Sequence, residues 1–221
     1  MDERFPRYLR WIVTKLDFVG LPNLGMLICG LAILGFVGTQ MLGAPLHQFT
    51  FAPDLVRDGQ WWRLFAFPVS EGLTNPLWLI FYVMFIYFVM NALEENWGPG
   101  PLTVFTAFAY ICAIAGSIIT NVSTNVWHYV LENIGFAFGT LFPDVEFYLF
   151  FVLPVKAKWM SLAIGGLLLL QFFGSSGMGK LFLLIAFCPY LLFFGPYLVN
   201  TVYLKRKIAK HRQRFDAQDW K

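Results

Sequence analysis

The chain has 221 residues, of which 58% are hydrophobic and 13% are charged, and its formal net charge is +3. A soluble domain carries roughly 25% charged residues, so this composition excludes an ordinary soluble protein and predicts one integral membrane domain. The three cysteines lie in separate apolar runs without CxxC spacing, and this pattern indicates small buried side chains and no disulfide framework or metal site.

The chain begins with a basic, amphipathic segment over residues 1–22, in which four cationic residues alternate with apolar ones. These residues are Arg4, Arg7, Arg10 and Lys15. The pattern predicts a juxtamembrane helix that lies on anionic headgroups. A secretory signal peptide is not expected, because the first apolar run begins only near Leu24 and no small-residue cleavage pattern follows it.

Six apolar segments then predict six transmembrane helices. They are Leu24–Met41, Asn75–Leu93, Leu102–Ile119, Val126–Phe142, Trp159–Phe173 and Leu181–Tyr203. The loop 42–75 is rich in aromatic residues, so we expect it to lie in the membrane interface. Residues 145–153 are apolar, but a spanning helix needs about 20 residues. The predicted division is therefore residues 1–22, a membrane domain over 23–204, and a basic tail over 205–221 that frays into solvent.

The distribution of basic residues predicts the orientation of the chain. With six spans, both termini lie on the same side of the membrane. Of the 16 Lys and Arg, only Arg57, Arg63 and Lys180 lie on the opposite side. Cytoplasmic loops carry the excess of positive charge, so both termini are expected to be cytoplasmic. The few residues outside the membrane, together with this charge distribution, favour a bacterial inner membrane.

Two short motifs flank the second predicted span. Trp61, Trp62 and Arg63 precede it, and a Trp-Arg pair at an interface can place an indole among acyl chains while the guanidinium binds phosphates or caps carbonyls. Glu94 and Gly98 follow it, and we expect Glu94 to be solvated or bonded to a neighbouring turn. Each motif alone is typical of an ordinary interfacial anchor.

Together, in this order and spacing, the motifs resemble those of the rhomboid-like superfamily of rhomboid proteases and derlins. The stretch Gly59–Pro68 resembles the first loop of that family, and the stretch Leu93–Gly98 is similar to the Glu-x-x-x-Gly motif that closes its second helix. The stretches Phe142–Pro143 and Pro154–Trp159 are similar to the junction between helices four and five in bacterial members. The resemblance covers about residues 20–205 and implies a six-helix rhomboid-like bundle.

The resemblance also implies where protease chemistry would lie, and the expected residues are missing. A rhomboid protease uses a serine in Gly-x-Ser-Gly on helix four and a histidine on helix six, with polar side chains from helix two near the oxyanion. The sixth predicted span contains no histidine, and the fourth contains no serine. The serine position falls near His128, while the polar helix-two positions fall near Trp78 and Tyr82.

One Gly-x-Ser-Gly does occur, at residues 174–177 between the fifth and sixth spans, with Ser176 in the third place. The pattern is also that of a flexible turn. For Ser176 to be catalytic, His128 must approach it from the same side of the membrane. Glu132 lies one turn after His128, so the two share a helix face. A carboxylate at membrane depth indicates a function or a bonded pair.

The leading hypothesis is a proteolytically inactive, derlin-like rhomboid protein, a pseudoprotease that binds transmembrane segments of client proteins. The alternatives are a divergent intramembrane serine protease that uses Ser176 and His128, and a structural subunit of a larger membrane complex. The expected partners are the lipid bilayer and client helices. No cofactor, metal or nucleic acid is expected.

Overall fold

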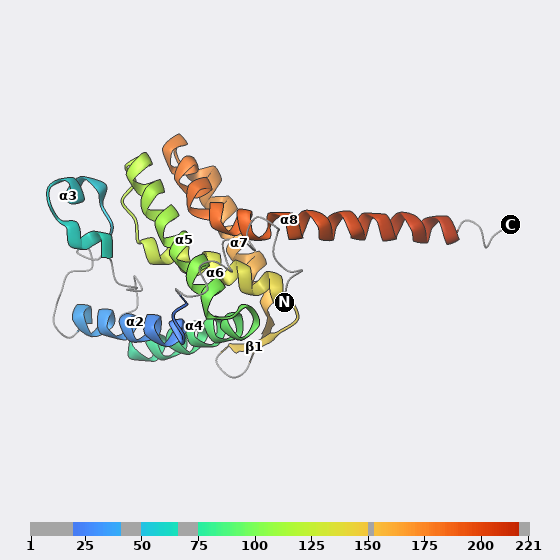
Figure 1. Cartoon of the computed structure of the whole chain (residues 1–221), viewed down its shortest axis with the longest axis horizontal. Helices are drawn as coiled ribbons and strands as arrows, with labels where there is room; N and C mark the ends of the chain where they lie inside the picture. Colours follow the sequence, from blue (N-terminus) through green and yellow to red (C-terminus); the bar gives the residue numbers. More distant parts are fainter. Residues whose placement is uncertain (1–19, 41–49, 66–74, 150–152, 217–221) are drawn as a thin grey trace.

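The computed structural model describes residues 20–40, 50–65, 75–149 and 153–216, and this part of the chain is mostly helical (Figure 1). Most of the predicted amphipathic segment 1–22 and parts of the loop 42–75 lie outside the described residues. The elements in chain order are α2 (Leu24–Gln40), α3 (Pro53–Arg57), η3 (Trp61–Phe65), α4 (Pro76–Trp97), α5 (Pro99–Thr120), α6 (Val126–Leu141), β1 (Glu146–Leu149), β2 (Leu153–Lys156), α7 (Ala157–Gly174) and α8 (Gly177–Asp216).

Each of the six predicted spans coincides with one long helix, and four of these helices are long and apolar enough to cross a membrane. They are α4, α5, α7 and the first part of α8, Gly177–Pro196. The helix α2 is apolar but has only 17 residues, and α6 has 16. The chain is therefore a helical membrane protein.

Local signals set the ends of α4. The Asn75 side chain accepts a hydrogen bond from the Leu77 N–H at 2.9 Å, and Pro76 occupies the first turn, where its missing N–H removes no helical bond. The helix passes the predicted end at Leu93 and stops at Gly98, whose φ of +90° favours glycine. The next helix, α5, begins directly after this glycine, at Pro99.

The helices alternate in direction. Asn23, just before α2, bonds Glu94 near the end of α4, whereas Cys29 bonds Val83 further back, so α2 and α4 are antiparallel. The chain changes direction again between α4 and α5 (Figure 1). The pairs Phe105–Phe193 and Gly116–Phe182 make α8 antiparallel to α5. The pairs Tyr129–Phe182 and Asn133–Ala186 make α8 parallel to α6. The pairs Gly139–Ser161 and Gly135–Ile164 make α7 antiparallel to α6.

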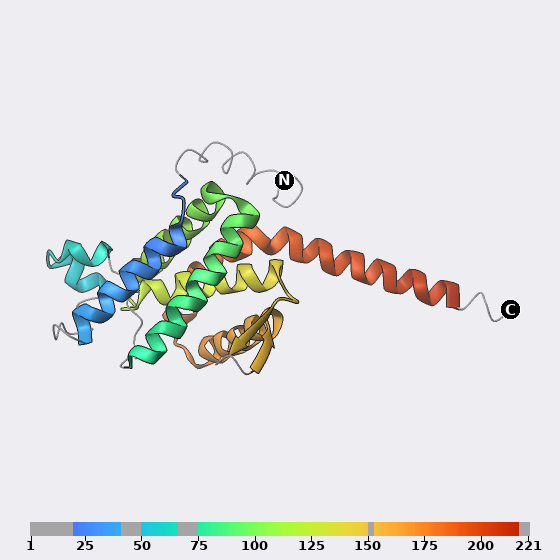
Figure 2. The ribbon, with the colours of Figure 1, turned by 90° about the horizontal axis from the view of Figure 1, so that it is seen from below.

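The mostly helical structure fits the predicted all-α membrane fold, but two short strands near residues 145–153 form a β-hairpin that the sequence analysis did not predict. Strands β1 and β2 are antiparallel, with Glu146 opposite Lys156. The ring of Phe147 lies 5.4 Å from that of Phe85 on α4 and 5.3 Å from that of Phe138 on α6. The hairpin therefore packs beside the bundle and leads directly into α7 (Figure 2).

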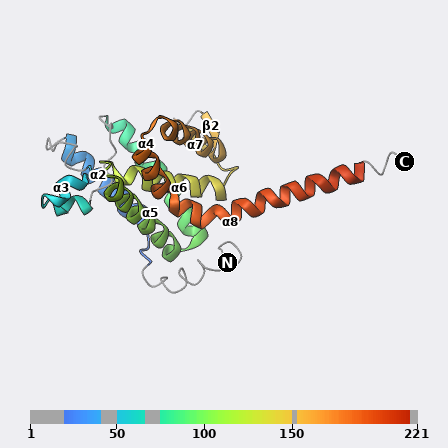
Figure 3. The same cartoon turned by 90° about the horizontal axis from the view of Figure 1, so that it is seen from above.

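The last helix is longer than predicted at both ends. The Gly-Ser stretch expected to be a turn contributes the first turn of α8, which begins at Gly177 and not at Leu181. The chain stays helical past Tyr203 to Asp216, so the expected fraying at residue 205 is wrong within the described residues. Pro189 and Pro196 lie inside α8, and Figures 1 and 3 show its second half running away from the bundle, opposite α3.

Candidate functional site

The helix α6 is the central element of the bundle, since it contacts α4, α5, α7 and α8. It occupies the place of the fourth predicted span, and α8 occupies the place of the sixth. The junction between α6 and α8 is therefore where the rhomboid resemblance locates the nucleophile and its base.

An asparagine holds this junction together. Asn133 on α6 is fully buried, and its Nδ2 donates to the Tyr129 carbonyl at 2.8 Å and to the Ala186 carbonyl of α8 at 3.0 Å. Its Oδ1 accepts from the Tyr190 N–H of α8 at 3.2 Å. The side-chain amide thus bonds both members of an i, i+4 pair on α8, next to Pro189, which has no N–H to donate.

A second polar contact lies on the same face of α6, two turns further on. The Thr140 hydroxyl and the Tyr190 hydroxyl are 2.7 Å apart, and Thr140 also donates to the Phe136 carbonyl at 2.8 Å. An amide and two hydroxyls therefore join α6 to α8 at this junction. Our sequence analysis missed Asn133, Thr140 and Tyr190, although a side-chain amide within a predicted span was a usable signal for Asn133.

His128 and Glu132 form the predicted pair on one face of α6. The Nε2 of His128 lies 3.3 Å from Oε1 of Glu132, and the side chains are 60% and 15% exposed. The His128 ring also contacts Tyr129 edge-on at 5.3 Å. The second carboxylate oxygen of Glu132 is buried without a hydrogen-bond partner among the described residues. The pair lies at the first turns of the helix, so His128 is accessible from the end of the bundle.

The structure does not join His128 to Ser176 by a hydrogen bond. The Ser176 hydroxyl accepts from the Gly179 N–H at 3.3 Å, and its carbonyl accepts from the Lys180 N–H at 2.9 Å. These bonds belong to the start of α8, where serine is a favoured N-terminal capping residue. Ser176 is exposed and has the geometry of a helix cap.

The first-loop motif divides into an exposed half and a buried half. Trp61 and Trp62 are 64% and 61% exposed, whereas Arg63 is only 4% exposed. The Arg63 guanidinium donates to the Thr50 carbonyl at 2.7 Å, and its Nε donates to Gln60 Oε1 at 2.7 Å. Arg63 therefore caps a carbonyl inside the loop, which is one of the two roles expected for it. The two indoles are left pointing outward.

The motif at the end of α4 joins two helices. Glu94 Oε1 accepts from the backbone N–H of Asn23 at 2.8 Å, just before α2 begins, so Glu94 is bonded to a neighbouring turn. The bond from Asn23 satisfies one of the N–H groups that the start of α2 leaves open. At the end of α4, the Gly98 N–H donates to the Glu94 carbonyl at 2.7 Å.

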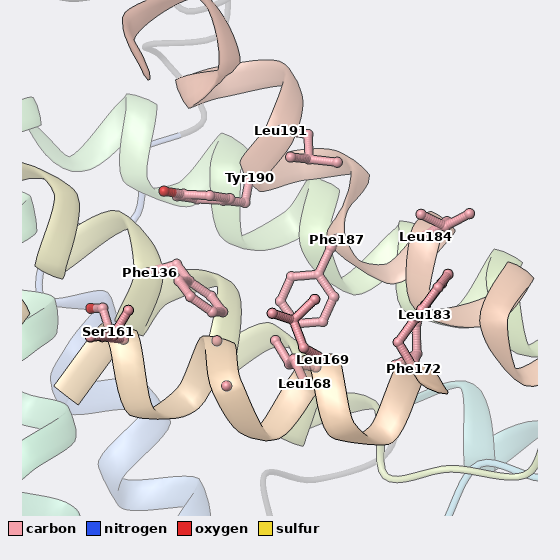
Figure 4. A pocket seen from close by; sticks show the side chains of 13 residues that line it. Phe136, Ser161, Leu168, Leu169, Phe172, Leu183, Leu184, Phe187, Tyr190 and Leu191 are labelled. Atoms are coloured by element: carbon pink, nitrogen blue, oxygen red, sulfur yellow. The ribbon is translucent and has the colours of Figure 1, made fainter. Parts of the chain in front are cut away.

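A cleft of about 600 Å³ opens between α6, α7 and α8 (Figure 4), and the sequence analysis did not predict it. The lining is almost entirely apolar. It consists of Phe136, Ser161, Leu162, Gly165, Gly166, Leu168, Leu169, Phe172, Leu183, Leu184, Phe187, Tyr190 and Leu191. The cleft exists because α7 packs mainly on α6, through Gly135 and Gly139, and leaves the α8 side open.

The described residues contain no group of three or more His, Cys, Asp or Glu side chains arranged to hold a metal ion. No protein-family model, curated protein or solved structure matches the chain. The fold and the site define a helical membrane protein whose central helix is joined to its last helix by an amide.

Proposed function

We propose that the chain is a rhomboid-like membrane protein without proteolytic activity that binds transmembrane segments of other membrane proteins, as the resemblance to derlins implies. The observation that carries this proposal is the junction between α6 and α8. Acyl transfer by a serine enzyme needs a nucleophile within hydrogen-bond reach of its base. At this junction Asn133 instead bonds backbone groups of α6 and α8, and the hydroxyls of Thr140 and Tyr190 bond each other.

The proposed bundle has six spans with both termini in the cytoplasm, in a bacterial inner membrane. The alternating helix directions support this count, and the 13 Lys and Arg outside Arg57, Arg63 and Lys180 support the orientation. At 1.5 Å per residue, α6 is about 24 Å long, shorter than the hydrocarbon core of about 30 Å. The contacts of α6 with α4, α5, α7 and α8 place it inside the bundle, where a helix shorter than the hydrocarbon core has protein neighbours along its length.

The two family motifs support a rhomboid-like scaffold because both have a structural role here. Arg63 closes the first loop on Thr50, and Glu94 joins the start of α2 to the end of α4. A scaffold that keeps these contacts while it lacks the reacting pair fits a protein that binds helices and does not cleave them.

The proposed client-binding surface is the outer face of α4. Leu77, Ile80 and Met84 follow each other at helical spacing and are 57%, 57% and 48% exposed. The stripe begins at the end of the bundle where Trp61 and Trp62 are exposed. In lipid, helices associate by close packing and not by the hydrophobic effect, so a client needs a regular surface of this kind.

Site-specific photo-crosslinking tests this proposal. A photoreactive amino acid is placed at Met84, and the protein is reconstituted in bilayers with a fluorescent Leu/Ala model transmembrane peptide. The control position is Ile111 on α5, which is 60% exposed and equally apolar. We expect several-fold more peptide adduct at Met84 than at Ile111. Equal adducts at both positions indicate random collisions in the bilayer and contradict client binding.

A further inference from the structure

The cleft between α7 and α8 has a shape that suits a chain-like ligand. It follows α7 from Ser161 to Phe172, with Phe136 and Phe187 on its floor and Leu184 on the opposite wall (Figure 4). Phe172 lies 11 positions after Ser161, which corresponds to a length of about 16 Å at 1.5 Å per residue. The hydrocarbon core of a bilayer is about 30 Å thick, so the cleft reaches through one leaflet only.

The polar groups that line the cleft already have partners. The Ser161 hydroxyl donates to the Gly135 carbonyl at 3.2 Å, and the Tyr190 hydroxyl is bonded to Thr140. The walls therefore offer apolar contact alone along the length of the cleft. Gly166 leaves space there, because a Cβ added to it has nothing within 4 Å.

A cation lies where the cleft ends. Lys180, in the first turn of α8, has its Nζ 5.9 Å from the centre of the Phe172 ring, which lines that end. Lys180 is partly exposed and forms no ion pair with any acidic side chain in the described part of the chain. An ammonium at the end of an apolar, leaflet-deep cleft is complementary to a lipid phosphate above its acyl chain.

We propose that this cleft binds an acyl chain of an anionic phospholipid from the adjacent leaflet, with the lipid phosphate paired to Lys180. A client helix is a poorer fit, because a helix that crosses the bilayer needs a surface about 30 Å long. The lipid site lies between α7 and α8, away from the client surface proposed on α4. It therefore goes beyond the proposed function and does not depend on it.

Native mass spectrometry of the detergent-purified full chain tests the headgroup contact, with dioleoyl phosphatidylglycerol and dioleoyl phosphatidylcholine as probes. We expect the wild-type protein to retain phosphatidylglycerol about fivefold better, the selectivity expected of one lysine near a lipid surface. Lys180→Gln is expected to remove this preference. The matched control is Lys158→Gln, which removes the same charge at the other end of α7, where Lys158 is paired with Asp144.

A second variant tests the cleft itself. Gly166→Leu places a side chain in the open space and is expected to lower the retention of both lipids at least threefold. Gly30→Leu on α2 is the control, because Gly30 is also exposed and has nothing within 4 Å of an added Cβ. Unchanged retention in Gly166→Leu, or an unchanged preference in Lys180→Gln, overturns the proposal. No client peptide is present, so neither outcome bears on client binding.

Discussion

Asn133 on α6 fastens the backbone of α8 at Tyr190: its Oδ1 accepts the Tyr190 N–H at 3.2 Å, while its Nδ2 donates to Ala186 at 3.0 Å. A proline in a helix interior removes one backbone hydrogen bond and disturbs its neighbours. The amide bonds the residue after Pro189 and a residue three positions before it, in a turn of α8 that lacks one backbone hydrogen bond. The same contact joins the two helices on which the proposed rhomboid resemblance would place a nucleophile and a base.

Asn133→Ala is expected to lower the free energy of unfolding by about 1–3 kcal/mol, because it removes two buried hydrogen bonds between α6 and α8. Thermal unfolding in detergent measures the effect. The control is Asn91→Ala, whose side chain bonds only to Glu95 on the surface. A melting temperature for Asn133→Ala equal to that of the control contradicts the role assigned to Asn133.

Two glycines on one face of α6 give opposite predictions for the same substitution. A Cβ at Gly139 overlaps the Ser161 hydroxyl and lies 2.7 Å from the Ser161 Cβ, whereas a Cβ at Gly135 lies 3.7 Å from the nearest atom, in Ile164. Overpacking of this kind costs about 1–3 kcal/mol. We therefore expect Gly139→Ala to lower the melting temperature and Gly135→Ala to leave it nearly unchanged.

A double variant checks the cause of the Gly139 effect. In Gly139→Ala with Ser161→Gly, the overlapping hydroxyl is absent, so part of the lost stability is expected to return. If the second change gives no recovery, the close approach of α6 and α7 at Ser161 is not the reason for the loss.

Arg63→Ala is expected to destabilise the protein by about 1.5–3 kcal/mol, the range for hydrogen bonds to charged groups, because the Thr50 carbonyl loses its partner. Arg57→Ala, which breaks an exposed ion pair with Asp54, is expected to cost at most about 1 kcal/mol. The two melting temperatures are compared in the same detergent. A larger loss for Arg57→Ala would show that Arg63 does not hold the loop.

Glu94→Ala is expected to expose the start of α2 to proteolysis, because the Asn23 N–H loses its acceptor. Limited proteolysis of the purified protein measures cleavage near this turn. Glu94→Gln keeps an acceptor oxygen and is expected to be cut more slowly than Glu94→Ala. Equal cleavage rates in the wild-type protein and in Glu94→Ala contradict the proposed link between α2 and α4.

The long helices could be predicted from the sequence because the signals that define them are local. Apolar run length located all six. The predicted start of the third span at Leu102 was too late, because α5 begins at Pro99, directly after Gly98. The predicted end of α4 at Leu93 was too early, since Glu94 and Glu95 are good helix formers whose charge does not stop a helix.

The hairpin and the junction could not be predicted, because both depend on contacts between distant residues. Phe147 has a place to pack only once α4 and α6 lie side by side. Asn133 finds its partners on α8, 53 and 57 positions further along the chain. The cleft likewise results from the packing of α7 on α6, which no local sequence pattern encodes.

The central claim, that no serine in this protein is activated for acyl transfer, is tested most directly with a fluorophosphonate probe. The purified protein is labelled in detergent beside Ser176→Ala and an active rhomboid protease prepared in the same way. We predict that the active protease is labelled and that this protein is not. Labelling of the wild-type protein that disappears in Ser176→Ala would contradict the account and establish Ser176 as a nucleophile.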